Sequence, residues 1–206
     1  MAEIPDERRE AAEAYAGKLN ALPHGLFGAW LGILILFWLR AYGMRSADAP
    51  PFEASVTPLL ALAIAMGFAV ALLPRGWYVP RSLCVEHRLY RLLGADRLRA
   101  IITDGDRINR KVRARFPGYR VHVGADALEA AARRSFTSER AHHGFWWFGV
   151  GSSIAGWIGG WPAWAIGLLV GNVLVNLLPM LLQRATRARI VLLRPAAVHA
   201  AFERSA

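Results

Sequence analysis

Four hydrophobic stretches alternate with polar segments along the 206-residue chain. They cover roughly residues 25–43, 56–74, 144–160 and 162–182. A helix needs about 20 apolar residues to cross the hydrocarbon core of a bilayer. The second and fourth stretches meet that length, whereas the third is shorter and rich in glycine, which suits close helix packing. The pattern predicts an all-α membrane protein with about four transmembrane helices.

The segments between these stretches complete a single integral membrane domain over residues 1–206. Apolar side chains recur at helical spacing before the first stretch, and Pro23 is expected to end that helix. Gly159-Gly160-Trp161-Pro162 is expected to form the turn between the third and fourth stretches. The expected order is an N-terminal amphipathic helix (1–23), a first helical hairpin (24–74), a basic cytoplasmic or interfacial segment with amphipathic helices (75–143), a second helical hairpin (144–190) and a C-terminal tail (191–206).

The positive charge is distributed unevenly along the chain. Of the 25 Lys and Arg residues, fifteen lie between the second and third stretches and none between the third and fourth. This alternation is what the positive-inside rule expects. It predicts a multi-pass protein of the plasma (inner) membrane with both termini and residues 75–143 in the cytoplasm. The net charge of +10 is thereby explained without nucleic-acid binding, although basic residues could also hold anionic headgroups or phosphate-bearing substrates.

Polar residues interrupt the fourth stretch at intervals of four, seven and four: Asn172, Asn176, Gln183 and Arg187. On a regular α-helix these positions form one stripe, which is costly in a membrane unless it faces protein, water or a ligand. Pro179 can kink the helix beside Asn176 and open space for a ligand. Interhelical hydrogen bonding accounts equally well for Asn172 but less well for Asn176, and snorkelling toward water is the simpler interpretation of the arginine.

A carboxylate and an imidazole precede the third stretch. Glu139 and His142 are three residues apart and therefore share one face of a helix. A carboxylate beside an imidazole holds it in one tautomer and makes it a better base. His143 is the adjacent alternative, pointing about 100° away. An interfacial ion pair is the simpler interpretation of these residues.

The two polar groups converge if the third and fourth stretches are antiparallel neighbours. Gln183, Arg184 and Arg187 would then lie level with Glu139 and His142 at one membrane face. Metal ligands could come from Glu139, His142, His143 and His122, but their spacing matches no recognised metal motif, so no metal is expected.

Three motifs carry a resemblance to a known family. Glu139-Arg-Ala-His142 precedes the second hairpin, and Asn176-Leu-Leu-Pro179-Met-Leu-Leu-Gln183-Arg184-Ala185-Thr186-Arg187 lies at its end. A basic loop reads Gly105-Asp106-Arg107-Ile108-Asn109-Arg110, with Pro117 beyond it. Over roughly residues 75–190 the chain resembles the glycosyl-4,4'-diaponeurosporenoate acyltransferases. Ala185 and Thr186 stand where that family usually has Tyr and Asn, which leaves the identity of the acceptor open.

The resemblance implies transfer of a fatty acyl group to a hydroxyl of a lipid-linked sugar, either a carotenoid glycoside or another glycolipid. The donor would be acyl-CoA or an acyl carrier protein thioester, used as a co-substrate without a tightly bound cofactor. Lateral diffusion in the membrane lipid would supply both the acyl chain and the lipid-linked acceptor. In this scheme His142 is the base and Glu139 orients it. The residues expected to bind the substrates are Asn109, Arg110, Asn172, Asn176, Gln183, Arg184 and Arg187.

Two other classes of function fit the same pattern. A non-catalytic membrane scaffold would use the interior polar residues only to lock its helices together. Another small lipid-modifying transferase, such as a lipid methyltransferase, should carry a nucleoside-binding feature, and the sequence shows no such motif. A transporter is disfavoured because the sequence contains no inverted repeat.

Overall fold

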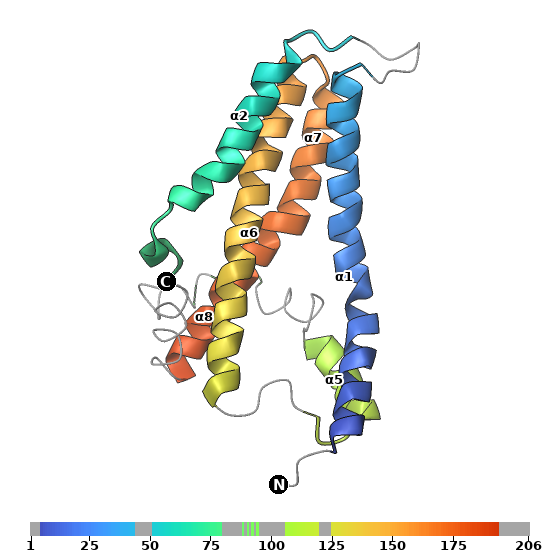
Figure 1. The fold of residues 1–206 in the computed structure, drawn as a ribbon, viewed down its shortest axis with the longest axis vertical. Helices are drawn as coiled ribbons and strands as arrows, with labels where there is room; N and C mark the ends of the chain where they lie inside the picture. Colours follow the sequence, from blue (N-terminus) through green and yellow to red (C-terminus); the bar gives the residue numbers. More distant parts are fainter. Residues whose placement is uncertain are drawn as a thin grey trace. The chain divides into compact units, whose positions relative to one another are not determined.

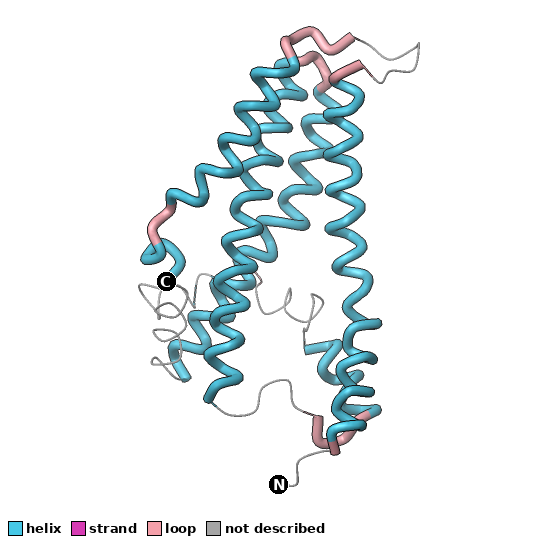
Figure 2. The backbone as a smooth tube through the Cα atoms, in the orientation of Figure 1, coloured by secondary structure: helices cyan, strands magenta, loops and turns pink. Residues whose placement is uncertain are grey.

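The computed structural model describes residues 5–43, 51–79, 88, 90, 92, 94, 106–119 and 125–193, and in these residues all regular structure is helical (Figures 1 and 2). This confirms the all-α prediction for the described part of the chain. The elements are α1 (Asp6–Ala41), α2 (Val56–Ala69), the 3₁₀ helices η1 (Val70–Leu72) and η2 (Arg75–Tyr78), α5 (Asp106–Arg115), α6 (Ala125–Ile158), α7 (Pro162–Asn172), the π-helix η3 (Val173–Leu177) and α8 (Leu178–Leu193).

The chain divides into two compact units. Unit 1 consists of Met1–Gly25, Tyr78–Phe136 and Leu181–Ala206. Unit 2 consists of Leu26–Trp77 and Thr137–Met180. Helices α1, α6 and α8 each contribute residues to both units, whereas α2, α7 and η3 belong to unit 2.

In unit 1 the start of α1 packs against the basic helix α5. The apolar cluster between them contains Ala12 of α1 together with Ile108, Val112 and Tyr119. Ile108 and Val112 are four residues apart and therefore lie on one face of α5, which leaves the arginines on the other faces. The N-terminal helix thus buries its apolar stripe against the basic segment that follows the second hydrophobic stretch.

The prediction that Pro23 ends the N-terminal helix is wrong, because α1 runs through this proline without a break for 36 residues. A proline inside a helix removes one backbone hydrogen bond. Beyond it, Trp30, Leu34 and Phe37 are fully or nearly fully buried in the main core of unit 2. Their burial supplies a reason for the helix to continue past the lost hydrogen bond.

Unit 2 consists mainly of the second part of α1, α2, the second part of α6, and α7 followed by η3, which run side by side (Figures 1 and 2). Glycines allow these helices to approach closely, as the sequence predicted. A Cβ atom added to Gly67 of α2 would lie 3.1 Å from the carbonyl oxygen of Gly144 on α6. One added to Gly171 of α7 would lie 2.7 Å from the Trp30 ring of α1.

The predicted turn between the third and fourth stretches is confirmed. Helix α6 ends at Ile158 and α7 begins at Pro162, a position where the missing N–H of proline costs no helical hydrogen bond. Gly160 has φ +77°, and the N–H of Trp161 donates to the carbonyl of Gly156 at 2.8 Å. A glycine in the left-handed region just past the helix is the usual way to satisfy these last carbonyls.

Large apolar side chains are exposed on unit 2 while polar side chains lie inside it. Asn172, Asn176 and Ser152 are fully buried. The exposed set includes Ile33, Ile35, Leu36, Leu62, Ile64, Phe68, Trp157, Ile166, Val170 and Leu174. Apolar surface this extensive is unfavourable in water and suits a hydrocarbon environment.

Two helical stretches among the described residues are long and apolar enough to cross a membrane: Asp6–Ala41 and Pro162–Leu192. Helix α2 is apolar but has only 14 residues, about 21 Å at 1.5 Å per residue, against a bilayer core of about 30 Å. Together with the exposed apolar surface, these helices favour association with a membrane. The four-helix count and the cytoplasmic placement of the termini stay predictions.

Candidate functional site

His142 is the first member of a line of hydrogen bonds in unit 2. Its Nδ1 lies 3.0 Å from Oδ1 of Asn176 in the π-helix η3. Nδ2 of Asn176 donates to Oδ1 of Asn172 at 2.8 Å, and Nδ2 of Asn172 donates to the backbone carbonyl of Trp146 at 2.9 Å. The line therefore begins and ends on α6 and passes through two fully buried amides.

The final acceptor fixes the direction of this line. A backbone carbonyl can only accept, so Asn172 must present its NH₂ group to Trp146 and its oxygen to Asn176. Asn176 then turns its own oxygen toward His142, which must donate from Nδ1–H. The proton of the neutral imidazole is consequently on Nδ1, and the lone pair of Nε2 is left to act as a base.

The imidazole is held in its neutral form. Burial lowers the pKa of His142 from its ordinary value of 6.5, because the charged form loses its hydration. The hydrogen bond with Asn176 opposes this effect and raises the pKa, but burial is the larger cause. Near neutral pH, His142 is therefore an uncharged residue able to accept a proton.

The predicted polar stripe is interrupted by the π-helix η3. Its wider turn is shown by the N–H of Leu178, which donates to the carbonyl of Val173, five residues earlier. Pro179 follows directly and lacks the N–H that a regular α-helix would require there. Because a π turn shifts the helical register, Asn172 and Asn176 do not continue in one α-helical line to Gln183 and Arg187. The sequence predicted that Pro179 would kink the helix. The structure has a π-helix before this proline instead.

Glu139 contacts a different histidine from the one expected. Its carboxylate is fully buried, and Oε1 lies 3.8 Å from Nδ1 of His143. The same Nδ1 lies 3.0 Å from the backbone carbonyl oxygen of Glu139. The orienting hydrogen bond of His142 comes instead from Asn176, an amide on another helix. The sequence analysis assigned that orienting role to Glu139. A catalytic role for Glu139 stays a prediction.

A second polar cluster lies in unit 1 around Arg187 of α8. The guanidinium is fully buried, so snorkelling does not describe it. Its Nε donates to the backbone carbonyl of Tyr78 at 3.2 Å, and Nη1 donates to Oγ of Ser135 at 3.0 Å. Ser135 Oγ donates in turn to the backbone carbonyl of Gln183 at 2.9 Å. A buried cation needs such partners because removing it from water is costly.

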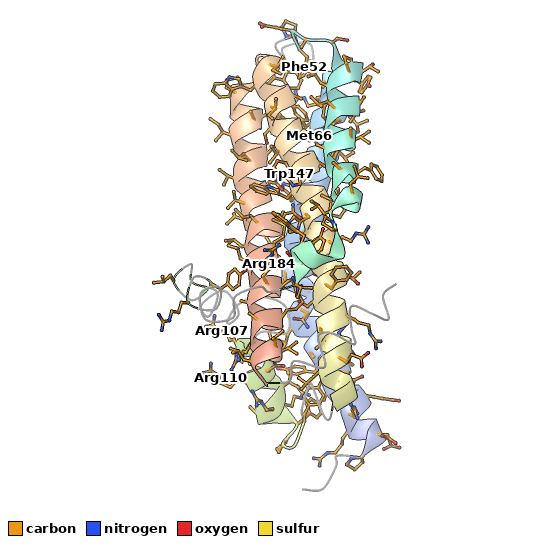
Figure 3. All side chains as sticks on the ribbon, turned by 90° about the vertical axis from the view of Figure 1, so that its left-hand side faces the viewer. Phe52, Met66, Arg107, Arg110, Trp147 and Arg184 are labelled. Carbon is orange, nitrogen blue, oxygen red and sulfur yellow. The ribbon has the colours of Figure 1, made fainter. Side chains whose placement is uncertain are left out.

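The remaining predicted binding residues are more accessible and lie in unit 1. Arg110 is exposed on α5, where Arg107 also projects, and Arg184 projects from α8 (Figure 3). The carbonyl of Asn109 accepts a hydrogen bond from Nε of Arg113 at 3.2 Å, one turn further along α5. These residues carry cationic or amide groups of the kind that binds phosphate, but their role stays a prediction.

Within the part of the chain that the structure describes, no three His, Cys, Asp or Glu side chains gather as metal ligands. His122, one of the possible ligands considered from the sequence, lies outside the described residues.

Sequence reasoning missed several residues around these clusters. In unit 2, the Phe27 ring of α1 packs edge-on against His142, with ring centroids 6.0 Å apart. In unit 1, Ser135 links Arg187 to the backbone of α8. Ser135 lies seven residues before His142, so helical spacing offered a signal for it. Nothing in the sequence indicated Phe27, because its contact depends on how α1 packs.

One of three comparisons with known proteins found a match. No curated protein matched the sequence, and no solved structure matched it either. The model of the family described as glycosyl-4,4'-diaponeurosporenoate acyltransferase matches residues 74–195, which include His142 and Asn176. This match covers more than half of the chain and agrees with the resemblance found in the motifs. The chain therefore belongs to the glycosyl-4,4'-diaponeurosporenoate acyltransferase family.

Proposed function

We propose that this protein is a multi-pass membrane acyltransferase that moves a fatty acyl group from a thioester donor to a hydroxyl of a lipid-linked sugar. Membership of the family supplies the class of reaction. The observation that carries the assignment of the site is the hydrogen bond between His142 and Asn176 at 3.0 Å. It holds an uncharged imidazole with Nε2 available as a base.

The reaction requires a base and a later acid at the same atom. Nε2 of His142 accepts the proton of the sugar hydroxyl as the hydroxyl oxygen attacks the thioester carbonyl carbon. The new C–O bond forms, the C–S bond breaks, and the departing thiolate takes the proton back from Nε2. A donor is also needed for the negative charge that develops on the carbonyl oxygen. Gln183, which lies in unit 1, is retained as a candidate for holding the acceptor.

Asn176 and Asn172 act in this scheme as positioning residues. Both are fully buried, and the amide groups of both form the hydrogen bonds that lead from His142 to the carbonyl of Trp146. They were expected to bind substrate, but their hydrogen bonds favour a role in holding the imidazole. Glu139 is retained as a second positioning residue, whose carboxylate lies 3.8 Å from His143, the neighbour of His142.

The cations of unit 1 are proposed to recognise the phosphates of the donor, an acyl-CoA or the prosthetic arm of an acyl carrier protein. Arg110 and Arg184 are the main candidates, with Asn109 as an additional donor. Arg187 supports this unit from inside, because its buried guanidinium already donates to Tyr78 and Ser135. The positive charge of the same segment supports a reaction at the cytoplasmic face of the plasma membrane.

The acceptor is a carotenoid glycoside or another glycolipid. The family description favours the carotenoid glycoside. Ala185 and Thr186, which replace the usual Tyr and Asn, favour a departure from it. What both acceptors share is a sugar hydroxyl on a lipid held in the membrane.

The experiment compares His142→Ala with His143→Ala in cells and in purified protein. Lipid mass spectrometry should show loss of an acylated glycolipid in the His142 variant and its persistence in the His143 variant. Expression and helical content should be equal in both. An unchanged lipid profile with His142→Ala would remove the catalytic assignment and favour the non-catalytic scaffold, for which the buried asparagines would serve only as interhelical links.

A further inference from the structure

An apolar groove lies between α2 and α6 in unit 2. Its sides are formed by Ile64 and Phe68 of α2 and by Phe145 and Phe148 of α6. Ala141 of α6 lies at the edge of the same groove. Its volume is about 330 Å³, and it is open along one side. Ile64 and Phe68 belong to the exposed apolar surface of unit 2, so the opening faces the same surroundings as the other exposed apolar side chains.

Two glycines lie where the two helices touch beneath this groove. Gly67 and Gly144 both line the groove, and a Cβ atom added to Gly67 would lie 3.1 Å from the carbonyl oxygen of Gly144. The backbones of α2 and α6 therefore approach closely here without side chains between them. The surrounding aromatic rings form the walls of a groove that none of the described residues of unit 2 fills.

The groove reaches the neighbourhood of the proposed base. Ala141 precedes His142 directly, and Phe145 follows it by less than one helical turn. Phe27 joins the two regions, because its ring packs edge-on against both His142 and Phe145, with centroid distances of 6.0 and 5.2 Å. The rings of Phe145 and Phe27 therefore connect the groove to the imidazole.

We propose that this groove binds the alkyl chain of the fatty acyl donor and so sets the preferred chain length. This inference rests on the proposed acyl transfer and adds the subsite for the donor's hydrocarbon. The walls offer apolar side chains and almost no polar surface, which matches a hydrocarbon chain and neither the sugar nor the phosphates of the substrates.

The distance from the base selects the acyl chain over the hydrocarbon of the acceptor. The acyl chain begins at the carbonyl carbon under attack, so its first methylene groups must lie within a few bonds of His142. The hydrocarbon of a glycolipid is separated from its reacting hydroxyl by a sugar ring. A groove lined by Phe145, which contacts the Phe27 ring that packs on His142, therefore suits the acyl chain.

The volume is also of the right order. Ligand sites span roughly 300–1,000 Å³. A water molecule in the liquid occupies about 30 Å³, and a methylene group is of similar size. A groove of about 330 Å³ therefore accommodates on the order of ten methylene groups, with the rest of a longer chain emerging through the open side.

The first test narrows the groove at an exposed position. Ala141→Phe adds a ring to the groove near the base, and Ala65→Phe adds the same ring to an exposed position on α2 that does not line the groove. Rates of transfer from octanoyl-CoA and palmitoyl-CoA are compared in vesicles of fixed lipid composition. Ala141→Phe should raise the octanoyl-to-palmitoyl ratio of kcat/KM at least ten-fold, whereas Ala65→Phe should leave it unchanged. An unchanged ratio in Ala141→Phe would overturn the proposal.

The second test does not depend on turnover. A palmitoyl-CoA analogue with a diazirine at the end of its chain is photolysed with the full-length protein and with His142→Ala. Labelled peptides should contain Ile64 or Phe148 in both proteins, and excess palmitoyl-CoA should suppress the labelling. Labelling confined to other helices would overturn the groove even if transfer is normal. Absence of transfer from every donor, with labelling intact, would instead refute the proposed function.

Discussion

Replacing Asn176 with Leu removes the oxygen that orients His142 while keeping a side chain of similar size. Two hydrogen bonds are lost, the one to His142 at 3.0 Å and the one to Asn172 at 2.8 Å. Interhelical hydrogen bonds in membranes contribute about 0.6–1.7 kcal/mol each. The free energy of unfolding should therefore fall by about 1–3 kcal/mol, which leaves most of the protein folded.

The effect on catalysis should exceed the effect on folding. Without Asn176 the imidazole can rotate and can carry its proton on either nitrogen. A positioned general base contributes about 10²–10⁴-fold to a rate, so loss of its positioning should lower kcat about 10²-fold. The hydrogen bond with Asn176 raises the pKa of His142, so its removal should also move the acidic limb of the rate profile to lower pH.

Ser152→Ala is the matched control for Asn176→Leu. It removes the hydrogen bond that Nε1 of Trp38 donates to Ser152 at 3.1 Å, which is another buried link between helices of unit 2. Its cost in stability should be about 1 kcal/mol, with kcat unchanged. Acyl transfer is measured in vesicles from a labelled thioester, and unfolding is followed by circular dichroism in a denaturing detergent.

Two results would contradict this reasoning. Asn176→Leu with reduced stability but kcat within about twofold of the wild type would show that the hydrogen bond only holds helices together. Equal losses of kcat in Asn176→Leu and Ser152→Ala would show that activity follows general stability and not the orientation of the imidazole.

Three further predictions concern acidity, packing and the buried cation. The kcat/KM of the wild-type enzyme should fall as the pH drops through a pKa below 6.5, because protonation of His142 removes the base; a profile that is flat through this range would contradict its role. Gly149→Ala should lower the thermal midpoint by several degrees, since a Cβ there would lie 2.6 Å from the amide nitrogen of Asn172 and overpacking costs about 1–3 kcal/mol. Gly167→Ala, with open space around its added Cβ, should not lower it. Arg187→Met should destabilise unit 1 by about 1.5–3 kcal/mol through the loss of charged hydrogen bonds, detected as earlier loss of hydrogen-exchange protection in α8; unchanged protection would contradict this.

The helical plan was accessible from the sequence because local patterns dictate it. The turn at 159–162 follows from two glycines and a proline, whose backbone preferences do not depend on distant residues. The first part of α6 follows from a run of helix formers that begins at Ala125. Pro23 misled the prediction, because the burial of Trp30, Leu34 and Phe37 in unit 2 keeps α1 continuous through it.

The candidate site was accessible only in part. Spacing along the chain singled out Glu139, His142, Asn172 and Asn176 as polar residues that a membrane environment should not tolerate without partners. It also suggested that His142 would be oriented by the residue nearest on its own helix. The partner is Asn176 instead, on a segment that the sequence treats as a separate helix.

The amino-acid order alone set which residues are helical and which side chains must find polar partners inside an apolar environment. The packing of α6 against α7 and η3 decided which partner each one found, because a hydrogen bond requires two atoms within about 3 Å and the register between helices sets that distance. The π turn before Pro179 changes this register, because it rotates the residues that follow it by a fraction of a turn relative to those before it. The tautomer of His142 is a property of the folded protein for the same reason: it is dictated by a carbonyl of Trp146 reached through two amides of another helix.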